Sequence, residues 1–273
     1  MKLVNLGCGN HFHTDWINLD KNPLSRGVKR ADVAGRLPFE DSSVDVVYSS
    51  HVVEHLESGD ALAMLRESHR ILKDRGVIRI VTPDLETIVR TYLVVLHDAL
   101  EGKAHAAEKY DWLILEMFDQ LVRERRGGAM ADFLRNPDLT IQHFIRSRIG
   151  QEVEQYWSSA PVIPSPWARI RGLSPSEIIV QMKNLLVRAL IHAVAGRNAA
   201  RNFELGRFRR SGEIHYRLYD RFSLQRLLAT AGFREFMCCR ADESKIPNFS
   251  SYELDTVASQ VRKPDSIHVE AIK

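Results

Sequence analysis

A pair of glycines comes directly after the first apolar run of the chain and is the strongest local signal of a ligand site. The run Lys2–Leu6 ends at Gly7-Cys8-Gly9. Glycines let a backbone approach a ligand closely and adopt dihedral angles that other residues avoid. A simple turn would use the same residues, so the glycines indicate a ligand site only in combination with further polar residues.

Two aspartates close the next apolar runs. Asp20 follows Trp16–Leu19, and Asp32 lies near the end of Val28–Val33. In an open parallel sheet, ligands bind beyond the carboxyl ends of the strands. There Asp20 can accept hydrogen bonds from both hydroxyls of a ribose. Asp32 can accept one from an adenine amino group while the backbone N–H of Val33 donates to a ring nitrogen. The alternative for Asp20 is an ordinary turn-initiating role.

The elements that must position these residues alternate between strand and helix patterns. Val44–Ser49 and Val77–Val81 are continuous apolar runs, which predict strands buried on both faces of a parallel sheet. Between them, Gly59–Lys73 has apolar residues at helical spacing and is followed by a stop at residues 74–76. Strands that alternate with helices predict a doubly wound α/β fold.

Helical periodicity dominates from about residue 85 to residue 210, which predicts an insertion on a loop of the sheet. The end of the chain returns to the earlier pattern. Ser223 is expected to cap a helix that stops at Gly232. Phe233–Arg240 and Ser266–Ala271 are then expected to supply the last two strands.

Length and composition fit one large domain or one domain with an insertion. The chain has 273 residues, of which 44% are hydrophobic and 27% charged, and this excludes wholesale disorder. No stretch approaches the ~18 uninterrupted apolar residues of a membrane span. Three cysteines (Cys8, Cys238 and Cys239), two of them adjacent, predict a reduced, cytoplasmic protein without disulfides.

Basic residues gather in one part of the chain. Residues 169–226 hold 12 Lys and Arg against 4 Asp and Glu. Such an excess favours an anionic partner, namely nucleic acid, phospholipid or a phosphorylated glycan carrier, although a solvated helical surface is the alternative. Within this region Ser176–Val194 is amphipathic, which indicates either a helix packed on its neighbours or a membrane-surface or lipid-carrier contact.

Several stretches together resemble the class I S-adenosylmethionine-dependent methyltransferases. They are NLGCG at the first strand, LPFEDSSVDVVYSSHVVEHL, LKDRGVIRIVTPDLE, GEIHYRLYDRFSLQRLLATAGF and RKPDSIHVEAIK. The resemblance implies a Rossmann-like, seven-stranded, mostly parallel sheet in the order 3-2-1-4-5-7-6. It assigns residues 1–95 and 211–273 to this domain and 96–210 to a helical insertion or lid that holds the acceptor region.

The resemblance also implies the cofactor and the residues that contact it. S-adenosylmethionine is the expected cofactor, S-adenosylhomocysteine the product, and no metal is expected. By position, Gly7, Cys8 and Gly9 line the methionine part, Asp20 holds the ribose, and Asp32 and Val33 hold the adenine. Ser49, Ser50 and His51 form the wall beside the sulfonium.

The chain departs from the family pattern at its first motif. Asn5 stands where an acidic residue is common, so it can hydrogen-bond there but lacks the charge. His11 stands in place of the third glycine, and only ten residues separate Gly9 from Asp20, as in a subgroup with a short first helix. Residues 10–13 are expected to substitute for the missing contacts.

Acceptor chemistry is assigned to residues near the fourth strand and the last helix. His51 is the candidate base, because it follows the fourth strand and imidazole suits proton transfer near neutral pH; a role as a wall of the cofactor site is the alternative. His215 and Tyr216 precede the last helix and are expected to reach the acceptor, with packing or capping as the alternative. Three arginines are expected to hold a phosphate or sugar carboxylate: Arg207, Arg209 and Arg210.

These residues favour an enzyme that methylates the hydroxyl of a glycan or a small metabolite. An RNA or protein methyltransferase that uses residues 169–226 is the main alternative. His51-Val52-Val53-Glu54-His55 also matches H-x-x-E-H, the inverted zinc-peptidase motif, which makes a zinc hydrolase a remote alternative. A non-catalytic binding module is another. We expect a cytoplasmic protein, peripheral to a membrane if the basic amphipathic segment contacts lipid.

Overall fold

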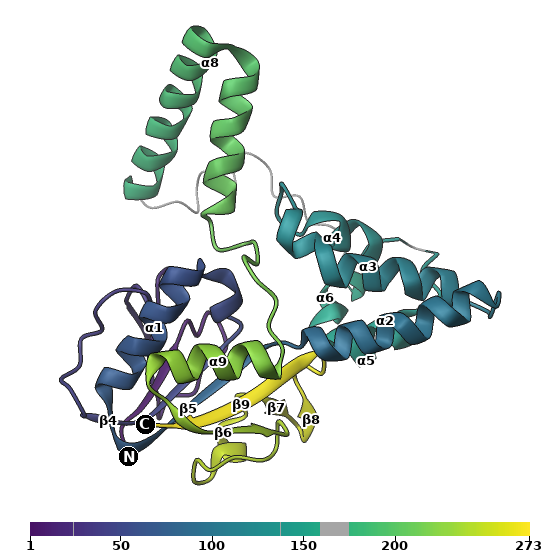
Figure 1. Ribbon diagram of the computed structural model, residues 1–273. Coiled ribbons are helices and arrows are strands. Elements are labelled where there is room, and N and C mark those ends of the chain that lie inside the picture. The colour runs from purple at the N-terminus through teal and green to yellow at the C-terminus, as the bar shows by residue number, and fades with distance from the viewer. Residues whose placement is uncertain (24, 137, 159–174) are drawn as a thin grey trace.

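A seven-stranded sheet forms the centre of the protein. The computed structural model describes residues 1–23, 25–136, 138–158 and 175–273. The strand order is β3-β2-β1-β4-β5-β9-β6, and β9 runs antiparallel to both of its neighbours (Figure 1). The strands are β1 (Leu3–Leu6), β2 (Ile17–Asp20), β3 (Val28–Arg30), β4 (Val44–Ser50), β5 (Leu72–Pro83), β6 (Arg234–Cys239) and β9 (Ser266–Ile272). The sheet order predicted from the sequence is confirmed.

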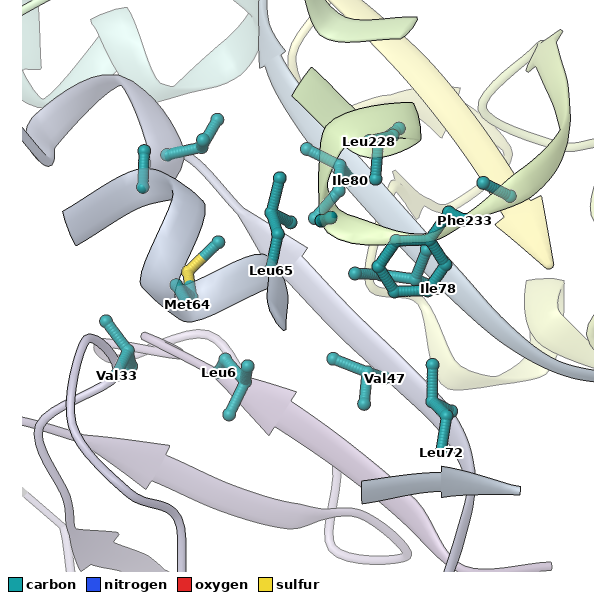
Figure 2. Packing of buried hydrophobic residues seen from close by; sticks show 14 of the residues in the cluster. Leu6, Val33, Val47, Met64, Leu65, Leu72, Ile78, Ile80, Leu228 and Phe233 are labelled. Atoms are coloured by element: carbon teal, nitrogen blue, oxygen red, sulfur yellow. The ribbon is translucent and has the colours of Figure 1, made fainter. Parts of the chain in front are cut away.

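Two helices, α1 (Ser58–Ile71) and α9 (Arg221–Ala231), cover one face of the sheet. Successive strand residues point to opposite faces, so every second apolar side chain reaches this helical layer. Leu6 and Val47 lie on the side of the sheet that faces Met64 and Leu65 of α1 (Figure 2). All four side chains are fully buried, and they belong to the largest apolar cluster of the described residues.

The ends of these elements differ from expectation at two points. Asp220, not Ser223, is the N-cap of α9: its carboxylate accepts from the Ser223 amide, and the Ser223 hydroxyl accepts from the Asp220 amide. Ser223 therefore completes a capping box from inside the first turn. The expected stop at residues 74–76 lies within β5, where the pairing with β4 shifts register.

The other face of the sheet is covered by an irregular segment. Around η3 (Phe249–Tyr252), the side chains of Ile246, Phe249 and Leu254 pack on Trp16 and Tyr48. A short hairpin of β7 (Thr256–Val257) and β8 (Gln260–Val261) follows this segment. No pattern considered in the sequence predicts this layer.

A buried arginine fixes the irregular segment to the sheet. Arg79 of β5 has no exposed side-chain surface, and its guanidinium donates to Asp255 at 2.7 Å and to Glu270 at 2.7 Å. It also donates to the carbonyl oxygens of Arg240 and Glu243. Burial of a charge is tolerated only when it is paired and hydrogen-bonded, and here both conditions hold.

Helices occupy the part of the chain between β5 and α9, where the sequence predicts an insertion. They are α2 (Leu85–Leu100), α3 (Ala106–Val122), α4 (Gly128–Leu134), α5 (Gln142–Ile149), η2 (Gly150–Val153), α6 (Glu154–Ser158) and α8 (Pro175–Arg209). The first six pack around a second apolar cluster that includes Trp112, Leu113 and Ile145. The division of the chain at residues 95 and 211 stays a prediction, and α2 continues across residue 95.

The segment α8 consists of two helical arms. Gly196 has φ 81° and ψ 179°, which breaks the helix there. In Figure 1 the two arms form a hairpin beyond the sheet, and Arg201 of the second arm pairs with Glu124, which follows α3, at 3.1 Å. Residues 169–174 of the basic region lie outside the described residues.

Candidate active site

Three cavities meet at the carboxyl ends of the strands, and His51 lines all of them. Their volumes are about 560 Å³, about 700 Å³ and about 310 Å³. We call them the nucleoside cavity, the tail cavity and the lid cavity, in that order. His51 follows β4 directly and has a φ of 54°, a left-handed conformation that is uncommon outside glycine. Strain of this kind is often kept at functional sites.

The nucleoside cavity brings together the residues predicted to hold the ribose and the adenine. Asp20, Asp32 and Val33 line it, together with Gly7 and His51. Asp20 is fixed by two backbone amides: its carboxylate accepts from Gly9 at 2.9 Å and from Asn22 at 2.8 Å. A carboxylate has about four acceptor positions, so lone pairs remain for a diol.

Asp32 is held in its charged form. Its carboxylate lies 3.1 Å from the Lys21 ammonium and accepts from the Ala34 amide at 3.2 Å. Burial alone would raise the pKa of Asp32, but the hydrogen bonds from Lys21 and Ala34 lower it below its usual value. The ionised carboxylate of Asp32 can therefore accept a hydrogen bond, as recognition of an amino group requires.

Gly7 lies between the nucleoside and tail cavities and lines both. Its φ is +67°, and a Cβ at this position would stand 2.3 Å from a methyl carbon of Val52. Its amide donates to the Leu19 carbonyl at 2.8 Å, which ties the loop to β2. Only glycine fits here, and the missing side chain leaves the passage between the two cavities open.

The tail cavity contains most residues predicted to contact the methionine part. Asn5, Cys8, Ser50 and His51 line it. Asn10 and His11 line it as well, which is where residues replacing the missing first helix are expected. Burial raises the pKa of Cys8 to about 11, so its side chain is a thiol at neutral pH.

Two predicted cofactor residues lie outside the linings of these cavities. Gly9 acts through its amide, which holds Asp20. Ser49 is 2% exposed, and its hydroxyl has no hydrogen-bond partner among the described residues. The contacts predicted for these two residues stay predictions.

The fit of S-adenosylmethionine to these residues rests on the shape and chemistry of the two joined cavities. The nucleoside cavity offers two carboxylates at the tips of neighbouring strands. The tail cavity offers amide, imidazole and hydroxyl groups, and the opening between the cavities passes a glycine that no side chain can replace. An extended ligand with a nucleoside at one end and a polar tail at the other matches this arrangement.

His51 forms a dyad with a buried carboxylate. Its Nδ1 lies 3.1 Å from Oε1 of Glu54, and its Nε2 lies 3.0 Å from Oγ of Ser266. Glu54 is the middle residue of η1 (Val53–His55) and has no exposed side-chain surface. Its other oxygen, Oε2, accepts from the Thr82 hydroxyl at 3.0 Å.

Glu54 is ionised despite its burial. Burial would raise its pKa, but the proximity of His51, whose Nδ1 lies 3.1 Å from Oε1, together with that of His55, lowers the pKa to about 2. A carboxylate at Nδ1 favours the tautomer with the proton on that nitrogen, so Nε2 can accept a proton. This is the arrangement by which a carboxylate orients a histidine base.

The lid cavity lies between His51 and the insertion, and no sequence pattern predicts it. His55 and His215 line it from the sheet side, and residues of α3, α4 and α6 line it from the other. Glu152 and Lys263 line both this cavity and the tail cavity. Glu152 forms ion pairs with Lys263 and with Arg262, which join the insertion to the end of the chain.

His215 lies in the lid cavity as a neutral ring. Burial lowers its pKa to about 3. Its Nδ1 has no partner within the described part of the chain, and its ring packs edge-on against His55 with centroids 4.5 Å apart. The predicted acceptor contact of His215 stays a prediction, and its position in the cavity supports it.

The H-x-x-E-H pattern does not form the helix that a zinc peptidase needs. His51 precedes the three-residue η1, and α1 begins only at Ser58. The two histidines of the motif therefore do not share the face of one α-helix, as the motif requires. Ligand atoms of Glu54, His55 and His215 do lie within 4.8 Å of one another, but Thr82 and His51 already engage the Glu54 carboxylate.

The three arginines predicted to hold the methyl acceptor do not lie together. Arg209, Arg210 and Tyr216 line the nucleoside cavity, and the Tyr216 hydroxyl donates to the Arg209 carbonyl at 2.8 Å. Arg207 instead stacks near the Phe203 ring, 5.8 Å from its centroid. Tyr216 thus joins the predicted site, whereas Arg207 does not line these cavities in the described structure.

Comparisons with known proteins agree with this geometry. Residues 4–80, which run from β1 into β5, match the family model described as a methyltransferase domain. Over these residues the chain is similar to that family. The match and the sheet order confirm the resemblance to the class I S-adenosylmethionine-dependent family, and with it the cofactor expected from the sequence.

Solved structures similar to the chain include an S-adenosylmethionine-dependent methyltransferase from Mesorhizobium loti. It is 25% identical over 30% of this chain and 47% of that protein, with a TM-score of 0.25, so the chain spans about half of its length. Two methyltransferases, from Thermotoga maritima and Archaeoglobus fulgidus, are each 12% identical over the whole of this chain. They are covered to 82% and 86%, with TM-scores of 0.38 and 0.39. No curated protein matches the chain.

Proposed function

We propose that this protein transfers the methyl group of S-adenosylmethionine to a hydroxyl group of a glycan or a small metabolite. The observation that carries the proposal is the His51–Glu54 dyad at the junction of all three cavities. A hydroxyl must lose a proton as it is methylated, and the dyad supplies an acceptor for that proton. The free cysteines agree with a reducing, cytoplasmic compartment.

Binding and alignment are assigned to the strand tips. When bound, S-adenosylmethionine supplies an electrophilic methyl group. Asp20 and Asp32 hold the nucleoside end, and Gly7 lets the ligand pass between the two cavities. Holding two reactants in line removes much of the entropic barrier to a displacement.

Proton transfer is assigned to His51. As the new C–O bond forms and the C–S bond breaks, Nε2 takes the proton of the acceptor hydroxyl. Glu54 stabilises the resulting imidazolium through Nδ1. The Ser266 hydroxyl contacts Nε2 at 3.0 Å and donates to Asp265 at 3.1 Å, so the acceptor hydroxyl takes the place of Ser266 at this nitrogen.

The test separates cofactor binding from turnover. We expect calorimetric titration of the purified protein with S-adenosylhomocysteine to show binding, and His51→Ala to keep the affinity within about threefold. A radiolabelled methyl-transfer screen over lipid-linked glycans, sugar nucleotides, RNA and proteins should label a hydroxyl-bearing glycan or metabolite. In His51→Ala we expect that labelling to fall at least ~100-fold.

Exposed His97 of α2 supplies the matched control, because His97→Ala removes an imidazole far from the cavities. Undiminished labelling by His51→Ala would remove the base role. Labelling of RNA or protein alone would replace the acceptor class, and absence of S-adenosylhomocysteine binding would overturn the whole proposal.

A further inference from the structure

The first arm of α8 presents an apolar surface that the described residues do not cover. Leu186, Leu190 and Val194 are 67%, 64% and 80% exposed. Ile179, Val180 and Val187 are more than 40% exposed on the same arm. Contiguous apolar surface of this kind marks an interaction site rather than ordinary exposure.

A groove between the two arms contains several of the hairpin's polar groups. Arg188 and His192 of the first arm line this groove with Arg197 and Arg201 of the second. Leu186, Leu190 and Val194 are absent from this groove, so they face away from the second arm. On the first arm the apolar stripe is therefore directed outward, whereas Arg188 is directed toward the second arm, where it pairs with Glu204 at 3.6 Å.

Charge indicates what covers the stripe. Residues 175–210 hold seven Lys and Arg side chains and two Glu. A helix with an apolar face and a basic face binds at the interface of an anionic membrane, where burial of the stripe and attraction of the cations act together. We propose that the α8 hairpin lies in the plane of an anionic phospholipid surface and attaches this protein to it.

An in-plane placement fits the hairpin better than a membrane span. By length and composition alone, Ile178–Arg209 is apolar enough to cross a bilayer. However, Gly196 divides it, and the second arm is only about 20 Å long at 1.5 Å per residue, less than the ~30 Å of a hydrocarbon core. That short arm also contains Arg197, Arg201 and Glu204, which are costly inside a bilayer.

Attachment in this plane would also orient the catalytic domain. The second arm continues into Arg209 and Arg210, which line the nucleoside cavity. A docked hairpin would hold the mouth of that cavity beside the lipid headgroups. Attachment to a lipid surface can be measured without methyl transfer. The proposal for the α8 hairpin therefore does not depend on the proposed reaction.

Vesicle sedimentation of the full chain tests the proposal. We expect at least ~10-fold tighter binding to phosphatidylcholine vesicles with about one third phosphatidylglycerol than to pure phosphatidylcholine, and loss of most of this binding at high salt. The triple variant Leu186→Ser, Leu190→Ser, Val194→Ser should bind the anionic vesicles at least ~10-fold more weakly. The matched control changes equally exposed residues of α2 and α3: Val94→Ser, Leu100→Ser and Val122→Ser.

Each other result overturns the proposal. Equal affinity of the native chain for both vesicle types, which involves no variant, would remove the anionic surface. Equal losses in the arm variant and in the matched control would show nonspecific adhesion. A concentration-dependent dimer in sedimentation velocity that the arm variant abolishes would assign the stripe to a second copy. Resistance of bound protein to a carbonate wash would assign a spanning hairpin instead.

Discussion

Glu54 is fully buried, ionised and placed against a histidine at the meeting point of three cavities. A carboxylate in such a position would be costly if it only packed, because its desolvation must be offset by hydrogen bonds and opposite charge. Thr82 supplies one hydrogen bond and His51 the other contact. The cost is understandable if the carboxylate serves to orient His51, which makes Glu54 a positioning residue for the proposed base.

Replacement of Glu54 by Gln should lower the turnover number without weakening cofactor binding. Gln keeps an acceptor for Thr82 but cannot stabilise an imidazolium. We expect kcat to fall about 100-fold while the KM for S-adenosylmethionine changes less than about threefold. Steady-state kinetics measure both, and Glu54→Asp, which retains the charge, should recover part of kcat. Equal losses in the Gln and Asp variants would point to packing instead.

Alanine substitutions at Gly7 and Gly9 test whether the cofactor uses the passage between the nucleoside and tail cavities. Both have positive φ, but a Cβ on Gly7 would collide with Val52, whereas one on Gly9 would meet nothing within 4 Å. Gly9→Ala should cost only the backbone strain of about 1 kcal/mol. Gly7→Ala should in addition close the passage and weaken S-adenosylhomocysteine binding at least ~10-fold by calorimetry. Similar affinities of the two variants would contradict the role given to Gly7.

For the secondary-structure elements, the local sequence pattern predicts the central sheet well, because its strands are apolar runs that can each be recognised separately. Val44–Ser49 and Val77–Val81 are continuous apolar runs, and runs of this kind are diagnostic of strands covered on both faces. End positions were less predictable. Ser223 has the right chemistry for a cap, but Asp220 has it too, and sequence alone cannot distinguish the cap from the third residue of a capping box.

Only one sequence feature indicates the irregular segment that covers the second face of the sheet. Arg79 interrupts an otherwise apolar strand, which signals a buried ion pair but does not reveal partners far along the chain. The lid cavity was unpredictable for the same reason. His51, Glu152 and Lys263 meet only after the insertion has folded back onto the sheet. The residues predicted to contact the cofactor, by contrast, come from consecutive strand ends, where order in the sequence already implies proximity.

Arg79→Met should unfold this layer most readily. The substitution keeps much of the volume but leaves the carboxylates of Asp255 and Glu270 buried without their cation, which typically costs about 3–5 kcal/mol. Urea unfolding monitored by circular dichroism measures the loss. Lys73→Met, which removes a half-exposed lysine paired with Asp45, is the control and should cost less than about 1 kcal/mol. A small cost for Arg79→Met would show that the network is dispensable.

For the whole molecule, buried histidines make stability depend on pH. Burial lowers the pKa of His215 to about 3 and that of His268 to about 4, against an ordinary value of 6.5. Between pH 6.5 and 4 the unfolded chain therefore binds protons that the folded chain does not. Stability falls as pH decreases through this window, by up to about 1.4 kcal/mol per pH unit for each histidine.

His268→Leu should reduce that pH dependence. The substitution removes one contributor and leaves His215 together with His11 and His69, whose pKa values burial also lowers, so the slope of the unfolding free energy between pH 6.5 and 5.5 should fall. Restricting the range to pH above 5.5 keeps the titration of Asp and Glu side chains small. Urea unfolding at several pH values gives the slope, and an unchanged slope would show that His268 is not a neutral buried ring in the native protein.

The pairing of β5 with β9 has a consequence for how the chain folds during synthesis. Arg79 leaves the ribosome 176 residues before Asp255 and 191 residues before Glu270. At a synthesis rate of about 5–20 residues per second, about 10–40 s pass between the synthesis of Arg79 and that of its partners. The whole insertion is translated in this interval. During that interval β5 is an unpaired edge strand, and the charge in its middle keeps it from adding to the strands of other nascent chains.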